Sequence, residues 1–287
     1  MIALLNPFAP AYMQRALLGV LLLSVLAAVC GVHVVLRRLA FATDVMSHTV
    51  FPGVVIAFAL DQSLLVGALA GGVLTAVLLT GSASLRRVGE DATLAIMLTS
   101  FFAVGVVLVS RQRTYASDLT AFLFGRVLTI DRGDLIFIGI VTAVGVSTLA
   151  LLHKELVMRA FDRDGAEALG YSVPRLDLVL NLVMAGVMVA ALKVVGTALA
   201  VALLITPAAT ARLVTDRVVT AMAVAAAVAA GSGVVGLALS YELSLEHDVR
   251  LAAGATVVSV MTVVFSLVLV GARIAGARPR LPLVSER

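Results

Sequence analysis

The sequence predicts an all-α protein, a bundle of helices that crosses a membrane many times. Of its 287 residues 61% are hydrophobic and only 13% are charged, and the mean hydropathy is +1.12. Soluble domains carry about 25% charged residues and about half apolar ones. The apolar runs are unbroken rather than alternating, which predicts membrane-spanning helices and not barrel strands. Because these runs extend from end to end, we expect a single transmembrane domain over residues 1–287.

Nine segments are long and apolar enough to be spans, since a helix needs about 20 mostly apolar residues to cross the hydrocarbon. They are 12–36, 41–60, 63–85, 91–110, 133–153, 176–193, 196–214, 218–240 and 252–273. The sixth and seventh are separated by a very short boundary. They are therefore also compatible with a tight hairpin or a re-entrant pair, which leaves eight full spans as an alternative.

The basic residues between the spans predict the orientation of the chain. Fourteen of the 21 Lys and Arg side chains belong to one alternate set of connecting segments and seven to the other. The richer set is expected in the cytoplasm. With nine spans the N-terminus then lies outside and the C-terminus inside a cell membrane. The basic pI near 9.7 has the same origin, because the charges occur in short clusters between spans, and we expect no nucleic-acid partner.

Several catalytic signatures are missing from the sequence. The only lysines are Lys154 and Lys193, and neither follows a Gly-rich loop, so there is no phosphate-binding loop of the Walker type. Neither an HExxH motif nor a GxSxG motif occurs. Cys30 is the only cysteine, which excludes an internal disulfide framework. We therefore expect neither an enzyme with its own ATPase site nor a permanently bound cofactor.

The second span contains an acid and an imidazole four residues apart, Asp44 and His48. Positions i and i+4 share a helix face. Ionisable side chains inside a membrane are costly and usually face a bundle interior or a polar pathway. Asp and His also suit a divalent ion of the zinc or manganese type. The pair is thus a candidate for metal transit ligands, and a polar pair that hydrogen-bonds across helices is the alternative.

Weaker ligand candidates lie nearby or at the opposite mouth of the bundle. Ser47 is expected to hydrogen-bond locally, and His33 in the first span is more typical of a packing histidine. His247 and Asp248 belong, with two glutamates at 242 and 246, to the expected last outer loop. Such a loop suits the receipt of a cation or a docking protein, although an ordinary solvated loop is the commoner explanation.

The main cytoplasmic loop, residues 154–175, is predicted to contain a short amphipathic helix. Asp162 is placed to cap its start, Ala166 and Leu169 to share one face, and Gly170 to end it as the C′ residue. A brief helix of this kind suits docking into a groove on a partner. A capped connector with no partner is the alternative.

Two prolines fall inside predicted spans. Pro52, followed by Gly53, comes just after His48, and Pro207 lies in the seventh span. Each removes a backbone donor, so we expect a kink or break that serves gating. Thr206 and Thr210 are candidates to satisfy the freed carbonyl groups. In the outer segment 111–134 we expect a short interfacial helix near residues 115–125, or a covering loop.

Four stretches together resemble the membrane permeases of zinc- and manganese-type ABC importers, the ABC-3 family. They are Asp44-x-x-Ser47-His48-x-x-x-Pro52-Gly53, Asp162-x-x-x-Ala166-x-x-x-Gly170, the Leu-Leu-Ile-Thr-Pro-Ala-Ala-Thr-Ala run at 203–211, and Leu-Ala-Ala-Gly-Ala-Thr at 251–256. They occur in the family's order over nearly the whole chain. Ala252 departs from the pattern, because a proline is usual there.

The resemblance implies a permease of the type II ABC importer kind. It would work as a homodimer above two cytoplasmic ATP-binding subunits, which use the ATP, and would receive Zn²⁺ or Mn²⁺ from an extracytoplasmic metal-binding protein. Asp44 and His48 would be transit ligands, and residues 161–172 the coupling element. A permease for a metal chelate or vitamin, or less readily a membrane-embedded metal-dependent enzyme, is the alternative.

Overall fold

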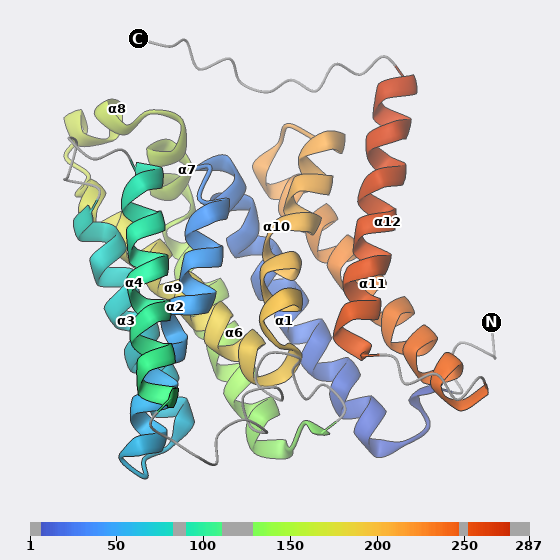
Figure 1. Ribbon diagram of the computed structural model, residues 1–287. Coiled ribbons are helices and arrows are strands. Elements are labelled where there is room, and N and C mark those ends of the chain that lie inside the picture. The colour runs from blue at the N-terminus through green and yellow to red at the C-terminus, as the bar shows by residue number, and fades with distance from the viewer. Residues whose placement is uncertain (1–6, 83–89, 111–128, 247–251, 276–287) are drawn as a thin grey trace.

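The computed structural model describes residues 7–82, 90–110, 129–246 and 252–275, and these ranges are helical with no strand (Figure 1). The helices are α1 (Ala11–Leu36), α2 (Ala40–Ala59), α3 (Leu64–Ser82), α4 (Glu90–Ser110), α6 (Arg132–Leu151), α7 (His153–Phe161), α8 (Arg163–Ala168), α9 (Val173–Val195), α10 (Thr197–Val214), α11 (Val218–Glu246) and α12 (Ala253–Ile274). The all-α membrane bundle predicted from composition is confirmed.

Eight of these helices are long and apolar enough to cross a membrane, and α10 is a shorter apolar helix. The junction between α9 and α10 is the single residue Gly196, whose φ of +82° is favourable only for glycine. In Figure 1 α10 runs back from this junction to the end where α11 begins. In the described part of the chain, α10 therefore makes a ninth passage between the two ends of the bundle.

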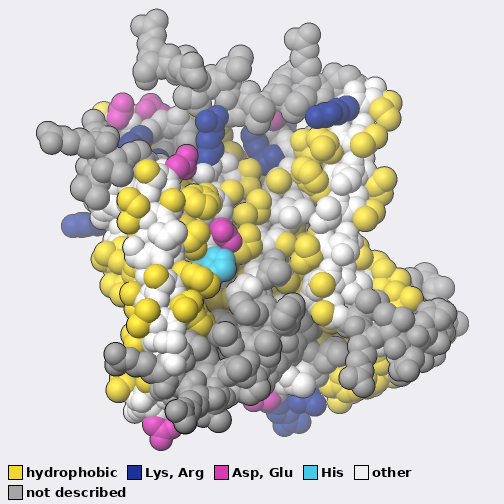
Figure 2. All heavy atoms as spheres, viewed as in Figure 1, with side chains coloured by type: hydrophobic (Ala, Val, Ile, Leu, Met, Phe, Trp, Pro, Cys, Tyr) yellow, Lys and Arg dark blue, Asp and Glu magenta, His cyan; other side chains and the backbone are white. Residues whose placement is uncertain are grey.

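The two ends of the bundle differ in what they carry. The short helices α7 and α8 and the end of α12 lie at the upper end in Figure 1, whereas α1 and α12 begin at the lower end. Basic side chains gather at the upper end of the face seen in Figure 2, above a broad apolar band. The upper end is the one expected in the cytoplasm.

Helices α1, α2 and α9 are the most buried of the candidate spans, and α4, α6 and α12 the least. The largest cluster of buried apolar side chains joins α1, α9 and α10, with Leu23, Met188 and Leu204 each at 2% exposure or less. The peripheral helices present exposed apolar residues such as Val107 and Leu267, which in a membrane protein face lipid or another chain. The central helices therefore form the frame on which α2 is positioned.

The helical backbone is not broken at the two prolines, and the alternative of a kink stays a prediction. Helix α2 continues through Pro52 and α10 continues through Pro207. Thr210 does donate from its hydroxyl to the Thr206 carbonyl at 2.7 Å, but the carbonyl freed by Pro207 is that of Leu203, one turn earlier. A gating role for Pro52, Gly53 and Pro207 stays a prediction.

Two other predictions concern the outer segments of the chain, the last outer loop and the segment near residues 115–125. Helix α11 extends to Glu246, so Glu242 lies on its last turns and not in an outer loop. The helix thus continues six residues beyond the predicted span. The interfacial helix expected near 115–125 lies outside the described residues.

Helix α2 is held against α3 by direct contact of the two backbones. A Cβ added at Gly67 would overlap the carbonyl oxygen of Gly53, and a Cβ at Gly53 would overlap the carbonyl oxygen of Gly67. Small residues allow this close approach in membrane helix pairs. Deeper in the same interface Thr75 donates to the Thr49 hydroxyl at 2.8 Å. These contacts orient α2, and with it Asp44 and His48.

The backbone contact predicts that Gly67→Ala destabilises the bundle by about 1–3 kcal/mol, the usual effect of overpacking. Thermal unfolding of the purified permease measures this loss. Gly139→Ala on α6 is the control, because no neighbouring atom lies within 4 Å of its Cβ position. It should leave stability unchanged or slightly raised. Equal melting of both variants with the wild type would contradict the backbone contact.

The orientation predicts which cysteine variants react from outside the cell. Leu60, 64% exposed, follows α2 at the outer end, and Ile274, 82% exposed, ends α12 at the cytoplasmic end. A membrane-impermeant maleimide should label Leu60→Cys in intact cells and Ile274→Cys only after permeabilisation. The native Cys30 is buried and should not react. The reverse labelling pattern would show that the chain has the opposite orientation in the membrane.

Candidate metal site and coupling segment

Helix α2 presents Asp44 and His48 on one face, as the spacing predicted. The His48 Nε2 atom lies 3.8 Å from the Asp44 Oδ1 atom. The two side chains are half-exposed in the single chain, at 45% for Asp44 and 37% for His48. The Asp44 carboxylate and the His48 imidazole are thus both accessible to an ion that approaches this face of α2.

The surroundings of the pair are apolar. The His48 ring meets the Phe102 ring of α4 edge-on, with centroids 6.1 Å apart. On the other side α2 touches α10. Figure 2 shows an imidazole next to a carboxylate in the middle of an otherwise largely apolar face. At about 1.5 Å per residue, Asp44 lies about 6 Å and His48 about 12 Å along α2 from its first residue.

The weaker candidates do not join this pair. Ser47 is 2% exposed and donates its hydroxyl to the Asp44 carbonyl at 2.7 Å, which is the local bond expected for it. His33 is completely buried in α1, and its ring centroid lies 5.9 Å from that of His153 on α7. His247 and Asp248 lie outside the described residues.

No group of three or more His, Cys, Asp or Glu side chains that could hold a metal ion occurs among the residues the structure describes. Asp44 and His48 therefore supply at most two protein side chains from one copy of the chain. Two side-chain ligands are fewer than the four of a closed structural zinc site or the three of a catalytic one. This geometry suits brief contact with an ion better than storage of one.

A cavity of about 530 Å³ adjoins the site between α2, α3 and α4. It extends from the middle of α2 toward its outer end, and most of its wall is apolar. The lining residues are Thr49, Pro52, Gly53, Ile56, Ala57, Leu60, Gln62, Val66, Gly67, Ala70, Gly71, Leu74, Ser100, Phe101 and Val104. None of them is a carboxylate, an imidazole or a thiol, so this cavity is not itself a metal site.

The loop expected in the cytoplasm folds as two short helices, α7 and α8, that meet at Asp162. The Asp162 Oδ1 atom accepts a hydrogen bond from the Gly165 amide at 2.8 Å and so caps α8, as predicted. Gly170, at φ +85°, ends the segment. The Gly170 amide donates to the Glu167 carbonyl and the Tyr171 amide to the Ala166 carbonyl, the pair of bonds that defines a Schellman motif.

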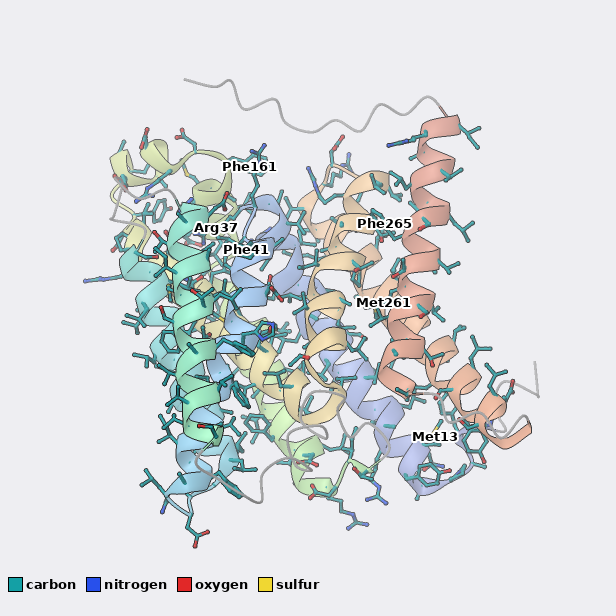
Figure 3. The ribbon with its side chains drawn as sticks, in the orientation of Figure 1. Met13, Arg37, Phe41, Phe161, Met261 and Phe265 are labelled. Atoms are coloured by element: carbon teal, nitrogen blue, oxygen red, sulfur yellow. The ribbon has the colours of Figure 1, made fainter. Side chains whose placement is uncertain are left out.

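Ala166 and Leu169, which were predicted to share one face, differ in burial. Ala166 is fully buried, whereas Leu169 is 65% exposed. Leu169 is the C-cap residue of α8, and its amide still donates to the Gly165 carbonyl at 3.0 Å. Together with Phe161 and Tyr171, Leu169 forms a set of exposed apolar side chains at the cytoplasmic end; Figure 3 labels Phe161 there.

The sequence reasoning missed one buried charged cluster. Asp177 on α9 binds Arg37 at the end of α1 and Arg159 on α7. From the sequence, both arginines belong to the basic residues that predict the orientation of the chain. An acid near the start of the sixth apolar span was the available signal, because such residues are rarely left without a partner.

Comparison with known proteins identifies the family. The profile of the ABC 3 transport family matches residues 9–272. The chain belongs to this family. Its permeases are transport components, and the eight apolar helices make this chain a multi-pass membrane protein.

Relatives in this family are similar over most of their length. The manganese transport system membrane protein MntC of Halalkalibacterium halodurans is 38% identical over 257 residues, which cover 89% of this chain and 86% of the relative. The chelated iron transport system membrane protein YfeC of Yersinia pestis is 32% identical over 262 residues, 91% and 87% of the two chains.

Solved structures share the fold. The structure of PsaBC from Streptococcus pneumoniae in complex with Fab matches with a TM-score of 0.80 at 29% identity, over 94% of this chain and 95% of that one. An inward-facing ABC transporter of the metal-chelate type matches with a TM-score of 0.70 over 90% and 86% of the chains. At 18% identity the second likeness concerns the fold alone. The ABC importer permease architecture inferred from the motifs is confirmed.

The cap at α8 predicts that Asp162→Ala raises amide exchange within the helix. Loss of an N-cap costs about 1 kcal/mol, which corresponds to about fivefold faster exchange at residues 165 and 166. Hydrogen–deuterium exchange of the purified permease measures it. Asp162→Asn retains a capping oxygen and should stay near the wild-type rate. Equal protection in Asp162→Ala and Asp162→Asn would show that the cap does not hold α8.

Proposed function

We propose that this permease carries a divalent metal ion into the cytoplasm, with Asp44 and His48 as ligands along its path. ATP hydrolysis by a separate cytoplasmic subunit would drive the cycle, so this chain would have no ATPase site of its own. The observation that carries the proposal is the half-exposed pair on α2. The remaining geometry supports it.

The exposure of the pair argues against a purely structural role. A carboxylate inside the hydrocarbon is costly, by up to about 3 kcal/mol at the centre of a bilayer even on scales that allow local relaxation. A packing pair would be expected to lie inside the bundle with its polar atoms satisfied. Asp44 and His48 instead point out of the single chain, into a region that the membrane would otherwise fill. In the working assembly this face must adjoin water, an ion or another protein surface.

A second copy of the chain is the partner we propose for this face. In a two-fold symmetric dimer the same patch meets itself. Two copies of α2 would then offer two carboxylates and two imidazoles to one ion, a set that a single chain lacks. Opening of the dimer would return the ion to two ligands, and weak coordination of this kind allows release.

Manganese is the proposed ion, with zinc as the competing one. The carboxylate–imidazole pair is compatible with both, because imidazole suits zinc and carboxylate suits manganese. Relatives named for manganese transport, such as MntC at 38% identity, favour Mn²⁺. An extracytoplasmic metal-binding protein would deliver the ion to the outer end of the bundle.

The segment α7–α8 is the proposed docking element for two ATP-binding subunits, one on each copy. Its support is the combination of a capped helix with the exposed Phe161, Leu169 and Tyr171 at the cytoplasmic end. Apolar side chains that project from a short helix fit a groove on a partner. The buried Ala166 would anchor α8 to its own chain, so Asp162, Ala166 and Gly170 would shape the segment and Leu169 would make the contact.

A chelated metal is the second candidate substrate, because the relative YfeC is named for chelated iron. A chelate would need a wide pathway and would not need direct ligands on α2. The apolar lining of the cavity beside α2 offers few groups to bind a polar chelate. Free-ion transport is therefore the proposal we favour.

The transit role predicts that Asp44→Ala and His48→Ala each lower metal uptake at least about tenfold, the scale seen when metal-site groups are removed. The assay uses the permease reconstituted with its ATP-binding subunit and metal-binding protein, and it measures uptake of Mn²⁺ and Zn²⁺. Asp91→Ala is the matched control, because it removes an exposed carboxylate from the neighbouring helix α4 at the cytoplasmic side.

Direct ligation also predicts a change of metal preference. His48→Cys introduces a soft thiolate, which should preserve Zn²⁺ uptake better than Mn²⁺ uptake. Unchanged uptake of both ions in the two alanine variants would end the transit-ligand proposal. Uptake of a chelate but of neither free ion by the wild type would support the second candidate.

A further inference from the structure

A buried charged cluster, here called the Asp177 node, joins three elements at the cytoplasmic end of the bundle. The Arg37 Nη2 atom lies 2.7 Å from Asp177 Oδ1. Arg159 makes two bonds to the same carboxylate, from Nε to Oδ1 and from Nη2 to Oδ2, each 2.9 Å long. Asp177 and Arg37 side chains are 6% exposed and Arg159 is 15% exposed. One carboxylate therefore ties α1, α7 and α9 together.

Stability alone is a weak reason for such a cluster. Buried ion pairs are often no more stabilising than apolar residues of the same volume, because each charge must leave water. The node instead fixes the relative orientation of the side chains that it joins. A planar guanidinium that meets a carboxylate through two parallel bonds holds the partners in a defined geometry. A displacement of either arginine would therefore also displace the shared Asp177 carboxylate.

One arm of the node begins at the coupling segment. Arg159 lies on α7, three residues before Asp162, the residue where α7 ends and α8 begins. Leu156 on the same helix is fully buried, so α7 is packed into the bundle and not free in solution. Movement of α8 and α7 as a unit would therefore displace Arg159.

The other arm ends at the helix that carries the metal ligands. Arg37 is the C-cap residue of α1 and lies three residues before the start of α2. The corner between them is closed by bonds from the Arg38 amide to the Val35 carbonyl and from the Leu39 amide to the Val34 carbonyl. These bonds form a Schellman motif with Arg38 in the left-handed region at φ +58°. The tight corner joins Arg37 mechanically to α2.

We propose that Asp177 is a positioning residue for transport, which transmits movement of the α7–α8 segment through Arg159 and Arg37 to α2 and its pair Asp44 and His48. The inference rests on the proposed function in that it takes α8 as the site on which the ATP-binding subunit acts. Figure 3 shows the labelled residues Phe161, Arg37 and Phe41, from α7, α1 and α2, at the same end of the bundle.

The test measures movement of α2 separately from metal uptake. Spin labels at Phe41→Cys on α2 and Ile274→Cys at the end of α12 report their distance in the full permease–ATPase complex in lipid nanodiscs, with and without ATP. The wild-type background should show an ATP-dependent change, and Asp177→Asn should lose most of it while ATP hydrolysis persists. Asp177→Glu, which retains the charge, should recover a large part of it.

Asn181→Ala is the matched control. Asn181 lies one turn further along α9, is 6% exposed and donates to the Thr80 hydroxyl of α3 at 3.0 Å. Its loss removes a buried polar contact of the same helix without touching α7 or α1. This variant should keep the ATP-dependent distance change. If it loses the change to the same degree as Asp177→Asn, general loosening of α9 explains the result and the proposal is overturned.

Uptake is read in the same preparations, reconstituted with the metal-binding protein. Mn²⁺ taken up per ATP hydrolysed should fall about tenfold in Asp177→Asn, within the range of measured coupling changes. If Asp177→Asn does not fold, Arg159→Lys keeps the charge but loses the two-bond geometry, and it should lower the same ratio. A full distance change and a normal uptake ratio in the folded variant overturn the proposal. A wild type that moves with ATP but takes up no metal would contradict the proposed function and leave the node intact.

Discussion

The cost of an ionisable side chain in hydrocarbon governs how this bundle is built. Only a few acids and imidazoles lie inside the helices, and each needs something other than lipid around it. The chain meets this need in two opposite ways. Asp177 is buried and satisfied by two guanidiniums, whereas Asp44 and His48 stay half-exposed and only 3.8 Å from each other. The first arrangement ties helices together, and the second leaves the ligand atoms accessible that we propose for a transported ion.

The exposed pair depends on the packing behind it. Helix α2 lies against α3 with its backbone in contact at Gly53 and Gly67, and a hydroxyl bond from Thr75 to Thr49 pins the same interface. Because that face of α2 is occupied, Ser47 turns inward while Asp44 and His48 point out of the chain. Small residues on one side of the helix thus determine where the charged residues on the other side are presented.

At the end of the bundle expected in the cytoplasm, local sequence signals define the short helix α8 that we propose as a docking element. Asp162 and Gly170 specify a short helix by cap chemistry that involves only neighbours in the chain. Ala166 packs this helix inward, and exposed apolar residues point away from it. The Asp177 node then lies between this proposed docking element and the corner that leads to α2. Few residues therefore connect the proposed metal ligands to the proposed docking surface.

Local patterns in the sequence determined much of this description. Run length and composition predicted the helices to within a few residues, except that α11 continues further, because these depend on consecutive residues. The i,i+4 spacing of Asp44 and His48 and the caps of α8 were likewise predicted, since helix geometry alone relates those positions. Motif order predicted the family, which the profile match confirmed.

Tertiary structure alone decided what is in contact and what is exposed. The partners of Asp177 lie 18 and 140 residues away along the chain, on helices that only packing brings together. The burial of His33 beside His153 also depends on neighbours distant in sequence. In an almost uniformly apolar chain, periodicity says little about which helix faces which. The few polar contacts and the close approach of glycines settle that arrangement.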